Sequence, residues 1–538
     1  MMGTRLLAIS HTLSWLVPAS PGVNFGLVTF GLGFAMFFQS QNIQARQSMR
    51  VCVCAMRIQE RMWTFAIGKT RRTTARLRPA IIVAIIAAIA ASAIVSPSNL
   101  MGDEVRILHS EVDGLSERIA IIDGARTSVD VAYYEIHDDE CTGQFLASLV
   151  RAANRGVRVR FLCDGHLATN NMPKALMELL IERGVCIREF PADTRYRVEL
   201  GRQRLHDKLV IVDGQTLLTG GRNLTSEYYG ISSRICIDRD ILLVGHAASH
   251  AETYFQTRWS DSRSRQPTLT REEKSKVVEK QVHPHWNTMP RCQAKIEASE
   301  WLAACELAPL AAKNSCLTQT PSQLHRIPAE CATFLHDFSN RDCGANAICI
   351  KNTKQAPGTI SSQLLVEIRR ARCSIEIESP YFAITHQLKE LLIDAEARGV
   401  RVRVLTNSLE STDQIPAQAG YANQRRSLLR GGIELYELRG RDTLHAKSMV
   451  VDGEIAMIGS YNFDVLSETR SSEVALLVRD RGVATELLES MSLHRSHATE
   501  VRLGDLLRHE ARESNVPMKD LREFQRLRLA APFIKPYL

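Results

Sequence analysis

The body of this chain repeats itself in sequence. The segment "SERIAIIDGARTSVDVAYYEI" (116–136) is echoed by "SQLLVEIRRARCSIEIESPYF" (362–382), and "NRGVRVRFLCDG" (154–165) is echoed by "ARGVRVRVLTNS" (397–408). In each copy, helical patterns alternate with strand patterns. This order predicts an α/β fold with two halves related by a pseudo-twofold axis, each a mixed β-sheet flanked by helices.

Each half then continues into a strand that carries an unusual polar pair. The two strands are "LHDKLVIVDG" (205–214) and "LHAKSMVVDG" (444–453), and in both the polar pair precedes an apolar run. Strand residues two apart face the same side of a sheet. Two pairs are therefore expected to point together: His206 with Lys208, and His445 with Lys447.

The Asp-Gly dipeptides after these strands favour hairpin turns. Asp213-Gly214 and Asp452-Gly453 are taken as two-residue loops, which sets the register of each hairpin. The expected facing positions are Gly221 opposite His206 and Ser460 opposite His445, with Asn223 and Asn462 two residues further along the same face. An imidazole, an ammonium and a carboxamide around a gap suit a phosphate group. One copy would more often be surface decoration, whereas two copies with equal spacing favour a function.

The repeated pattern His-x-Lys-x4-Asp-x6-Gly-(Ser/Gly)-x-Asn resembles the phospholipase D superfamily over residues 103 to 495. The phrases "GGRNLTSEYYG" (220–230) and "SPYF" (379–382) look like its bacterial cardiolipin synthase branch. This resemblance implies an enzyme that transfers or hydrolyses phosphodiesters of glycerophospholipids through a phosphohistidine. Gly221 departs from the family pattern, which has serine at this position.

The resemblance also implies roles for individual residues. One histidine attacks phosphorus and the other protonates the leaving alcohol; we assign His206 and His445 to these roles respectively, while the sequence leaves the order open. The expected catalytic set is His206, Lys208, Asp213, His445, Lys447 and Asp452, with Asn223, Ser460 and Asn462 binding phosphate and Asp240 and Glu473 orienting the histidines. Turn formation alone would explain the two motif aspartates, which therefore receive a supporting role. No cofactor or metal is expected, because no His, Cys and Asp cluster has metal-ligand spacing.

The sequence predicts five regions along the chain. They are an N-terminal basic and hydrophobic targeting segment (1–102), a first phospholipase D-like domain (103–260), a cysteine-containing linker or insertion (261–356), a second phospholipase D-like domain (357–495) and a C-terminal tail (496–538). Disulfides are predicted among the six cysteines of the linker, and buried free thiols are predicted at Cys163, Cys236 and Cys373.

The position of the basic residues bears on the substrate. The chain has a net charge of +8, but residues 1–100 hold ten Lys and Arg against the single Glu60, so the remaining body sums to about −1. A nuclease must attract a polyanion through Lys and Arg. A glycerophospholipid substrate is therefore favoured, with a nuclease as the alternative; both motifs being intact argues against a catalytically inactive binding protein.

The N-terminal segment predicts a membrane location. The uncharged run "AIIVAIIAAIAASAIV" (80–95) follows four arginines between 71 and 78, which predicts that the body lies beyond the inner membrane, on the periplasmic side. Ala91-Ser92-Ala93 fits a signal-peptidase site, and a cleaved signal and a retained anchor remain equal alternatives. A second span at 23–38, or a true start at Met56 or Met62, also stays open. The sequence leaves the oligomeric state undetermined.

Overall fold

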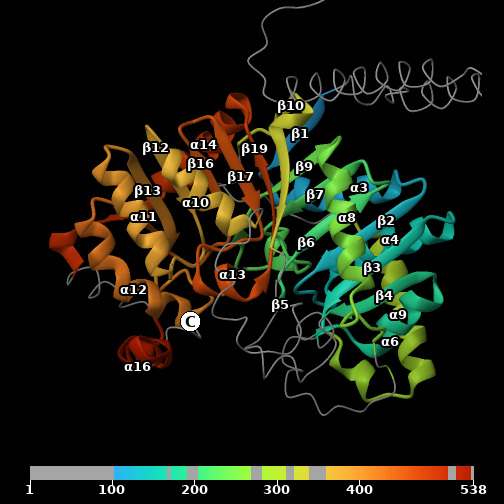
Figure 1. Cartoon of the computed structure of the whole chain (residues 1–538). Helices are drawn as coiled ribbons and strands as arrows, with labels where there is room; N and C mark the ends of the chain where they lie inside the picture. Colours follow the sequence, from blue (N-terminus) through green and yellow to red (C-terminus); the bar gives the residue numbers. More distant parts are fainter. Residues whose placement is uncertain are drawn as a thin grey trace, which may run out of the picture. The chain divides into compact units, whose positions relative to one another are not determined.

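The computed structural model describes the repeated body and most of its connections (Figure 1). Residues Val95–Leu538 cluster as one compact unit. The described residues are 102–165, 171–190, 204–267, 269, 282–309, 320–337, 359–506 and 516–534. The predictions for the N-terminal segment fall on residues outside these ranges. No helix in the described ranges has both the length and the apolar character that a membrane crossing requires.

The first half is built on an eight-stranded mixed sheet. Strands β2, β3 and β4 pair in parallel, while β6, β7, β9, β1 and β10 continue the sheet with antiparallel pairing. In sheet order the strands are β10 (Leu324–Ile327), β1 (Asp103–Leu108), β9 (Asp240–Val244), β7 (Thr216–Gly220), β6 (Lys208–Val212), β2 (Ser128–Tyr133), β3 (Arg158–Asp164) and β4 (Val185–Phe190).

The second half repeats this plan with a second eight-stranded sheet. Strands β12, β13 and β14 are parallel, and β12 pairs antiparallel with β16 just as β2 pairs with β6. In sheet order the strands are β11 (Ala332–His336), β19 (Val474–Val478), β17 (Ile455–Gly459), β16 (Ser448–Val451), β12 (Ser374–Glu378), β13 (Arg401–Asn407), β14 (Glu434–Leu438) and β20 (Ala498–Val501). The predicted two-part α/β fold is confirmed.

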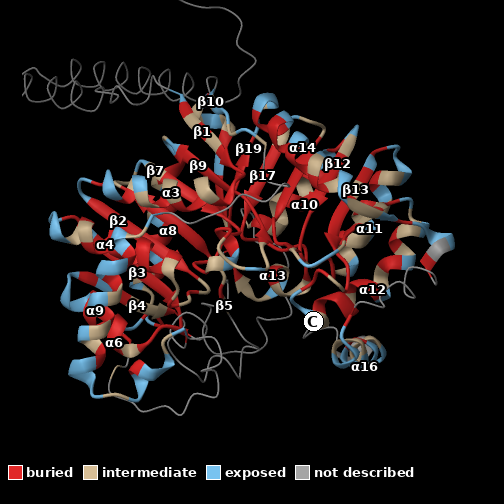
Figure 2. Cartoon of the chain, turned by 180° about the vertical axis from the view of Figure 1, so that it is seen from behind, coloured by how far each residue is buried: buried red, intermediate tan, exposed pale blue. Residues whose placement is uncertain are grey.

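Helices cover both sheets, and one core joins the halves. Leu217 and Leu243 of the first sheet share a buried apolar cluster with Ile458 and Leu476 of the second. Figure 2 shows the strands at the centre of the molecule coloured as buried. Burial of this shared surface holds the halves together. The helices are α3 (Glu111–Asp123), α4 (Glu140–Asn154), α6 (Lys174–Glu182), α8 (Ala247–Ser260), α9 (Arg291–Leu307), α10 (Ile360–Arg370), α11 (His386–Ala397), α12 (Ile415–Arg430), α13 (Val465–Thr469), α14 (Arg481–Ser496) and α16 (Met518–Ile534).

Two short strand pairs cross from one half to the other. Strand β5 (Arg204–Leu205) pairs in parallel with β18 (Ser471–Ser472), and β8 (Cys236–Ile237) pairs in parallel with β15 (Thr443–Leu444). In each pair, the segment that leads into a motif histidine lies beside a segment of the opposite half. The crossing strands thus bring the two motifs to one place.

The two motif hairpins form, but with a register that differs from the prediction. Val212 pairs with Thr216 and Val451 pairs with Ile455, so each loop contains three residues and not two. Asp213 and Gly214 both have positive φ, 53° and 65°, which fits the predicted Asp-Gly turn. The extra loop residue shifts the partner strand by one position. Gly221 and Ser460 therefore do not lie opposite the histidines as predicted.

The predicted linker contributes to both halves in its described parts. Helix α9 packs against α4 and α6, β10 forms an edge of the first sheet and β11 forms an edge of the second. Cys292, Cys305 and Cys331 are free thiols, while the other three linker cysteines lie outside the described residues. Among the predicted buried thiols, Cys163 and Cys236 are buried and free, whereas Cys373 is exposed, which corrects the prediction for that residue.

Candidate active site

His206 is held between β5 and β6 by contacts to the opposite half. Its backbone N–H donates to the Ser472 carbonyl, and its Nδ1 lies 2.8 Å from Glu473 Oε2. Glu473 is completely buried, while 12% of the His206 side chain is exposed. No described residue contacts His206 Nε2 at hydrogen-bonding distance. The contact predicted for Glu473 is thus present, and it leaves the second ring nitrogen of His206 open.

His445 is held by the equivalent contacts in the other half of the site. Its backbone N–H donates to the Ile237 carbonyl, and its Nδ1 lies 2.6 Å from Asp238 Oδ2. Tyr228 adds a hydroxyl 3.2 Å from Nε2. Each motif histidine is therefore oriented by a carboxylate of the other half. The two half-sites form a single site that neither half could build alone.

The predicted role of Asp240 is wrong, because Asp238 orients His445. Asp240 is buried in an ion-pair network in which Arg118 and Arg222 both donate to Oδ2 at 2.7 Å. The sheet register shows which residues are equivalent in the two halves. Gly220 pairs with Asp240, and its equivalent Gly459 pairs with Ala475, so Asp240 corresponds to Ala475 and not to Glu473. The residue two positions before each of these partners is Asp238 in the first half and Glu473 in the second.

The two motif lysines lie beside their histidines. Lys208 Nζ donates to the His206 carbonyl at 2.8 Å and lies 4.9 Å from the centre of the Tyr134 ring. Lys447 Nζ lies 3.1 Å from His445 Nε2. Burial lowers the pKa of Lys208 to about 7 and that of Lys447 to about 8. An anionic phosphate in the site would stabilise their charged forms.

The two histidines differ electrostatically. Burial and the charge of Lys208 hold the pKa of His206 well below its usual value. Burial and Lys447 also lower the pKa of His445, while Asp238 opposes this change. Burial raises the pKa of Glu473 to about 7. Burial also acts to raise the pKa of Asp238, but the charge of Lys447 and a hydrogen bond from His445 outweigh it, so the pKa of Asp238 is lowered. Asp238 thus favours a protonated imidazole more strongly than Glu473 does.

The predicted phosphate-binding residues lie in the site with different contacts. The Asn223 amide donates to the Tyr228 hydroxyl at 3.0 Å, and the Oδ1 atoms of Asn223 and Asn462 are buried without a partner in the described part of the chain. Ser460 Oγ donates to Glu473 Oε2 at 2.6 Å, so this hydroxyl supports the carboxylate. A Cβ at Gly221 would lie 2.4 Å from both Asp238 carboxylate oxygens, which explains why serine is absent there.

The two motif aspartates lie outside the site, which corrects their placement in the catalytic set. Asp213 accepts hydrogen bonds from the backbone N–H groups of residues 126 to 128 and from the Thr127 hydroxyl. Asp452 accepts the equivalent backbone bonds from residues 372 to 374. Both lie at the hairpin loops, a whole strand away from the histidines. They fix the start of β2 and β12 to the hairpins.

Three tyrosines surround the histidines. The Tyr134 ring centre lies 4.6 Å from that of His206, Tyr228 lies 4.9 Å from His445, and Tyr381 lies 6.5 Å from His445. Tyr134 and Tyr381 follow strands as conspicuous aromatic residues in the sequence. Tyr228 sits in a short 3₁₀ turn (Ser226–Tyr228) without periodicity, so no sequence signal distinguishes it. Within the described ranges, no three His, Cys, Asp or Glu side chains form a group that could hold a metal ion.

Some known proteins are similar to this chain in sequence, and a solved structure is similar to it in fold. Cardiolipin synthase C of Escherichia coli is 28% identical over 414 residues, covering 70% of this chain and 81% of that protein. An uncharacterized protein of Helicobacter pylori is 25% identical over 419 residues, covering 72% and 78%. The crystal structure of phosphatidylserine synthase from Haemophilus influenzae superimposes with a TM-score of 0.57 at 16% identity, covering 82% of this chain and 98% of that one.

A family model also matches both halves of the chain. Its description is "Cardiolipin synthase, PLD-like domain", and it matches residues 119–259 and 364–494. These two segments contain both motif histidines together with the carboxylates that orient them. The chain therefore belongs to the family of cardiolipin synthase, phospholipase D-like domains.

Proposed function

We propose that this protein is a phosphatidyltransferase that moves a phosphatidyl group between alcohols through a phosphohistidine. The observation that carries this proposal is the crossed arrangement of the site, in which Glu473 orients His206 and Asp238 orients His445. Two imidazoles in one buried site can divide the chemistry between a nucleophile and an acid.

His206 is the nucleophile in this proposal. Its Nε2 is open among the described residues, and its low pKa keeps the ring neutral. Nε2 attacks phosphorus and forms the P–N bond while the P–O bond to the leaving alcohol breaks. His445 Nε2 donates a proton to the departing oxygen, and ionised Asp238 stabilises the protonated ring before that transfer. Lys208 and Lys447 neutralise the non-bridging oxygens, where charge gathers in the transition state.

The second step reverses the first with a different alcohol. The incoming hydroxyl attacks phosphorus, its proton passes to His445 Nε2, and the P–N bond to His206 breaks. Water in place of the alcohol would yield phosphatidic acid. The names of the relatives, cardiolipin synthase and phosphatidylserine synthase, support transfer to an alcohol.

We further infer that the substrate is a glycerophospholipid and that the protein works at a membrane. The near-neutral body favours lipid over nucleic acid, since a nuclease depends on basic contacts to phosphates. The basic and apolar N-terminal sequence supports a body associated with the inner membrane or exported, on the periplasmic side.

The test is a product assay with the full-length protein. Vesicles of phosphatidylglycerol are expected to yield cardiolipin and glycerol, with a minor amount of phosphatidic acid, as resolved by mass spectrometry. Single-stranded and double-stranded DNA in parallel tubes are expected to remain intact. Cleavage of DNA with no phospholipid product would replace this proposal with a nuclease.

A further inference from the structure

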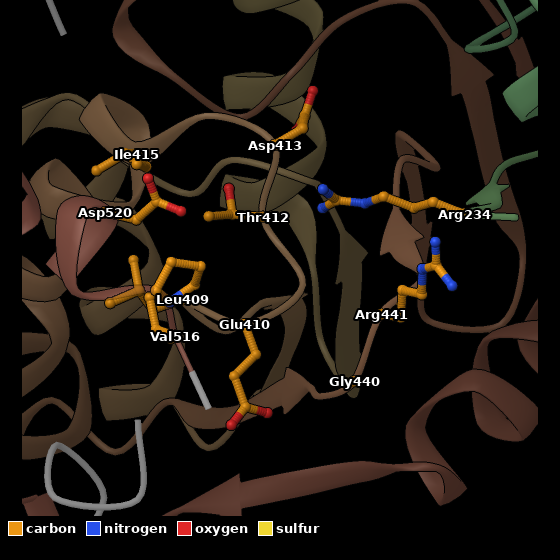
Figure 3. Close-up of a pocket in the computed structure, with 11 residues that line it drawn as sticks. Arg234, Leu409, Glu410, Thr412, Asp413, Ile415, Gly440, Arg441, Val516 and Asp520 are labelled. Carbon is orange, nitrogen blue, oxygen red and sulfur yellow. The ribbon is translucent and has the colours of Figure 1, made fainter. Parts of the chain in front are cut away.

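A polar pocket lies beside the His445 half of the site. Its volume is about 600 Å³, and it is enclosed by the loop at 409–413, the start of α12, the turn at 440–441 and the start of α16. Figure 3 shows the guanidinium groups of Arg234 and Arg441 on one side of the pocket, with Thr412 and Asp520 across from them. The mechanism above uses none of these residues.

The pocket is connected to the catalytic site through two contacts. Asp413, which lines the pocket, accepts hydrogen bonds of 2.8 and 3.0 Å from the Tyr381 hydroxyl, and the Tyr381 ring lies beside His445. Arg234 donates from Nε to the Thr443 hydroxyl at 2.9 Å, two residues before His445. The pocket therefore adjoins His445, the proposed general acid and base.

The pocket lining carries two arginines, Arg234 and Arg441, and three carboxylates, Glu410, Asp413 and Asp520. The side formed by the arginines suits an anionic group, and the carboxylates suit hydroxyls. Arg234 is fixed by its bonds to Thr443 and to the Ser411 carbonyl, and Arg441 donates to the Ser233 hydroxyl. Neither guanidinium forms an ion pair with a described carboxylate, so both retain N–H groups for a ligand. A guanidinium fork matches the oxygens of a phosphate. Across the pocket, the Thr412 hydroxyl and the Asp520 carboxylate can bond to hydroxyls.

We propose that this pocket binds the acceptor alcohol as a phosphorylated polyol, with the phosphate on Arg234 and Arg441 and a free hydroxyl directed past Asp413 toward His445. This inference rests on the proposed function. The hydroxyl attacks the phosphohistidine, loses its proton to His445 Nε2 and displaces His206 from phosphorus. A leaving group without phosphate, such as glycerol, fills only the part of the site next to His445. The arginines therefore serve the acceptor and not the donor.

The partition of the phosphohistidine between alcohol and water tests this pocket. With phosphatidylglycerol vesicles as donor and acceptor, Arg441→Ala is expected to lower the ratio of cardiolipin to phosphatidic acid about tenfold, because water captures the intermediate more often. Arg441→Lys should recover part of the ratio. Free sn-glycerol 3-phosphate should compete with the acceptor in the wild type and compete less in Arg441→Ala. Arg441 is exposed and its removal leaves the core untouched.

Arg430→Ala is the matched control, because it removes an exposed arginine from the same half at the far end of α12. Its product ratio should equal that of the wild type. A ratio within twofold of wild type in Arg441→Ala, in protein that still consumes phosphatidylglycerol, would overturn the acceptor site alone. If the wild type makes no phospholipid product, the proposed function fails. Calorimetric binding of sn-glycerol 3-phosphate to wild type but not to Arg441→Ala would then still support the pocket, and equal binding would refute it.

Discussion

The two half-sites are copies of one arrangement whose small differences suggest a division of labour. In both, a histidine Nδ1 bonds to a carboxylate of the opposite half, and a buried lysine lies two residues after the histidine. His206 pairs with the longer Glu473, whose pKa burial raises, while His445 pairs with Asp238, whose pKa is lowered. A neutral ring with an open Nε2 suits a nucleophile, and a ring beside an ionised carboxylate suits an acid.

The positions next to these carboxylates differ in a related way. Ser460 Oγ bonds to Glu473, whereas the Asp238 carboxylate fills the space that a side chain at Gly221 would need. The serine hydroxyl that resemblance assigned to phosphate is thus used to fix a carboxylate. The two sheets therefore resemble each other more closely than the two sets of residues around the histidines do.

The largest effects are expected from the histidines, and the type of leaving group separates them. His206→Ala and His445→Ala should each lower turnover of phosphatidylglycerol by at least about 10⁴-fold, since the two act as a unit. A phosphatidyl ester of p-nitrophenol needs no proton for departure. His445→Ala should therefore release p-nitrophenolate in a first-turnover burst, while His206→Ala should release none.

The same experiment can reverse the assignment of the two roles. A burst from His206→Ala and none from His445→Ala would make His445 the nucleophile. Residual activity near wild type in either variant with the natural lipid would contradict the shared site. Circular dichroism spectra that match the wild type serve as the control for folding.

Asp238 and Asp240 are expected to affect different properties, and the effect of either on kcat should be smaller than that of the histidines. Asp238→Asn removes the charge that supports protonated His445, so kcat should fall about 10²- to 10³-fold with the fold intact. Asp240→Asn removes a partner from two buried arginines and should lower the free energy of unfolding by about 3–5 kcal/mol, with near-normal turnover of the folded protein. Denaturant unfolding and kcat measured on both variants check this; equal kinetic loss in both would contradict it.

The pH dependence follows from the lysines and has a defined direction. Lys208 and Lys447, with pKa values lowered to about 7 and 8, lose their charge as the pH rises through that range. Binding of an anionic phosphodiester should weaken as they do so. KM should rise about tenfold between pH 7 and pH 9, measured at fixed ionic strength. Lys208→Arg keeps its charge and should show a flatter rise in KM. A wild-type KM that does not change between pH 7 and pH 9 would refute the role of the two lysines in binding the phosphate.

The sequence predicted the two-part fold and pointed to the two His-Lys pairs, because both features are repeated along the chain. Matching order and spacing identified both His-Lys pairs, and the alternation of helix and strand identified the two sheets. The choice between Asp238 and Asp240 could not be predicted, because residues two apart would face the same side of an extended strand. Only the structure shows that β9 begins at Asp240, which pairs with Gly220 of β7. Tyr228 reaches His445 from the other half through a turn, which no local pattern reveals.

The smallest kinetic effect is expected at the third position of the motif, where the two halves are most alike. Asp213→Asn and Asp452→Asn should each leave kcat within about twofold of wild type, because both carboxylates bond to backbone N–H groups at the hairpin loops and not in the site. Loss of these bonds should lower stability by about 1–2 kcal/mol per variant, as for a lost helix cap.

For Asp213, the stability difference should depend on pH in one direction. Hydrogen bonds from Ser128 and Thr127 outweigh the effect of burial and lower its pKa to about 2. A carboxyl with a depressed pKa contributes stability above its ordinary pKa and loses that contribution as the pH falls through the folded value. The gap in unfolding midpoint between wild type and Asp213→Asn should thus be full at pH 5 and shrink between pH 4 and pH 2. A large fall in kcat with unchanged stability would instead return Asp213 to the catalytic set, because only a direct part in the chemistry would then explain it.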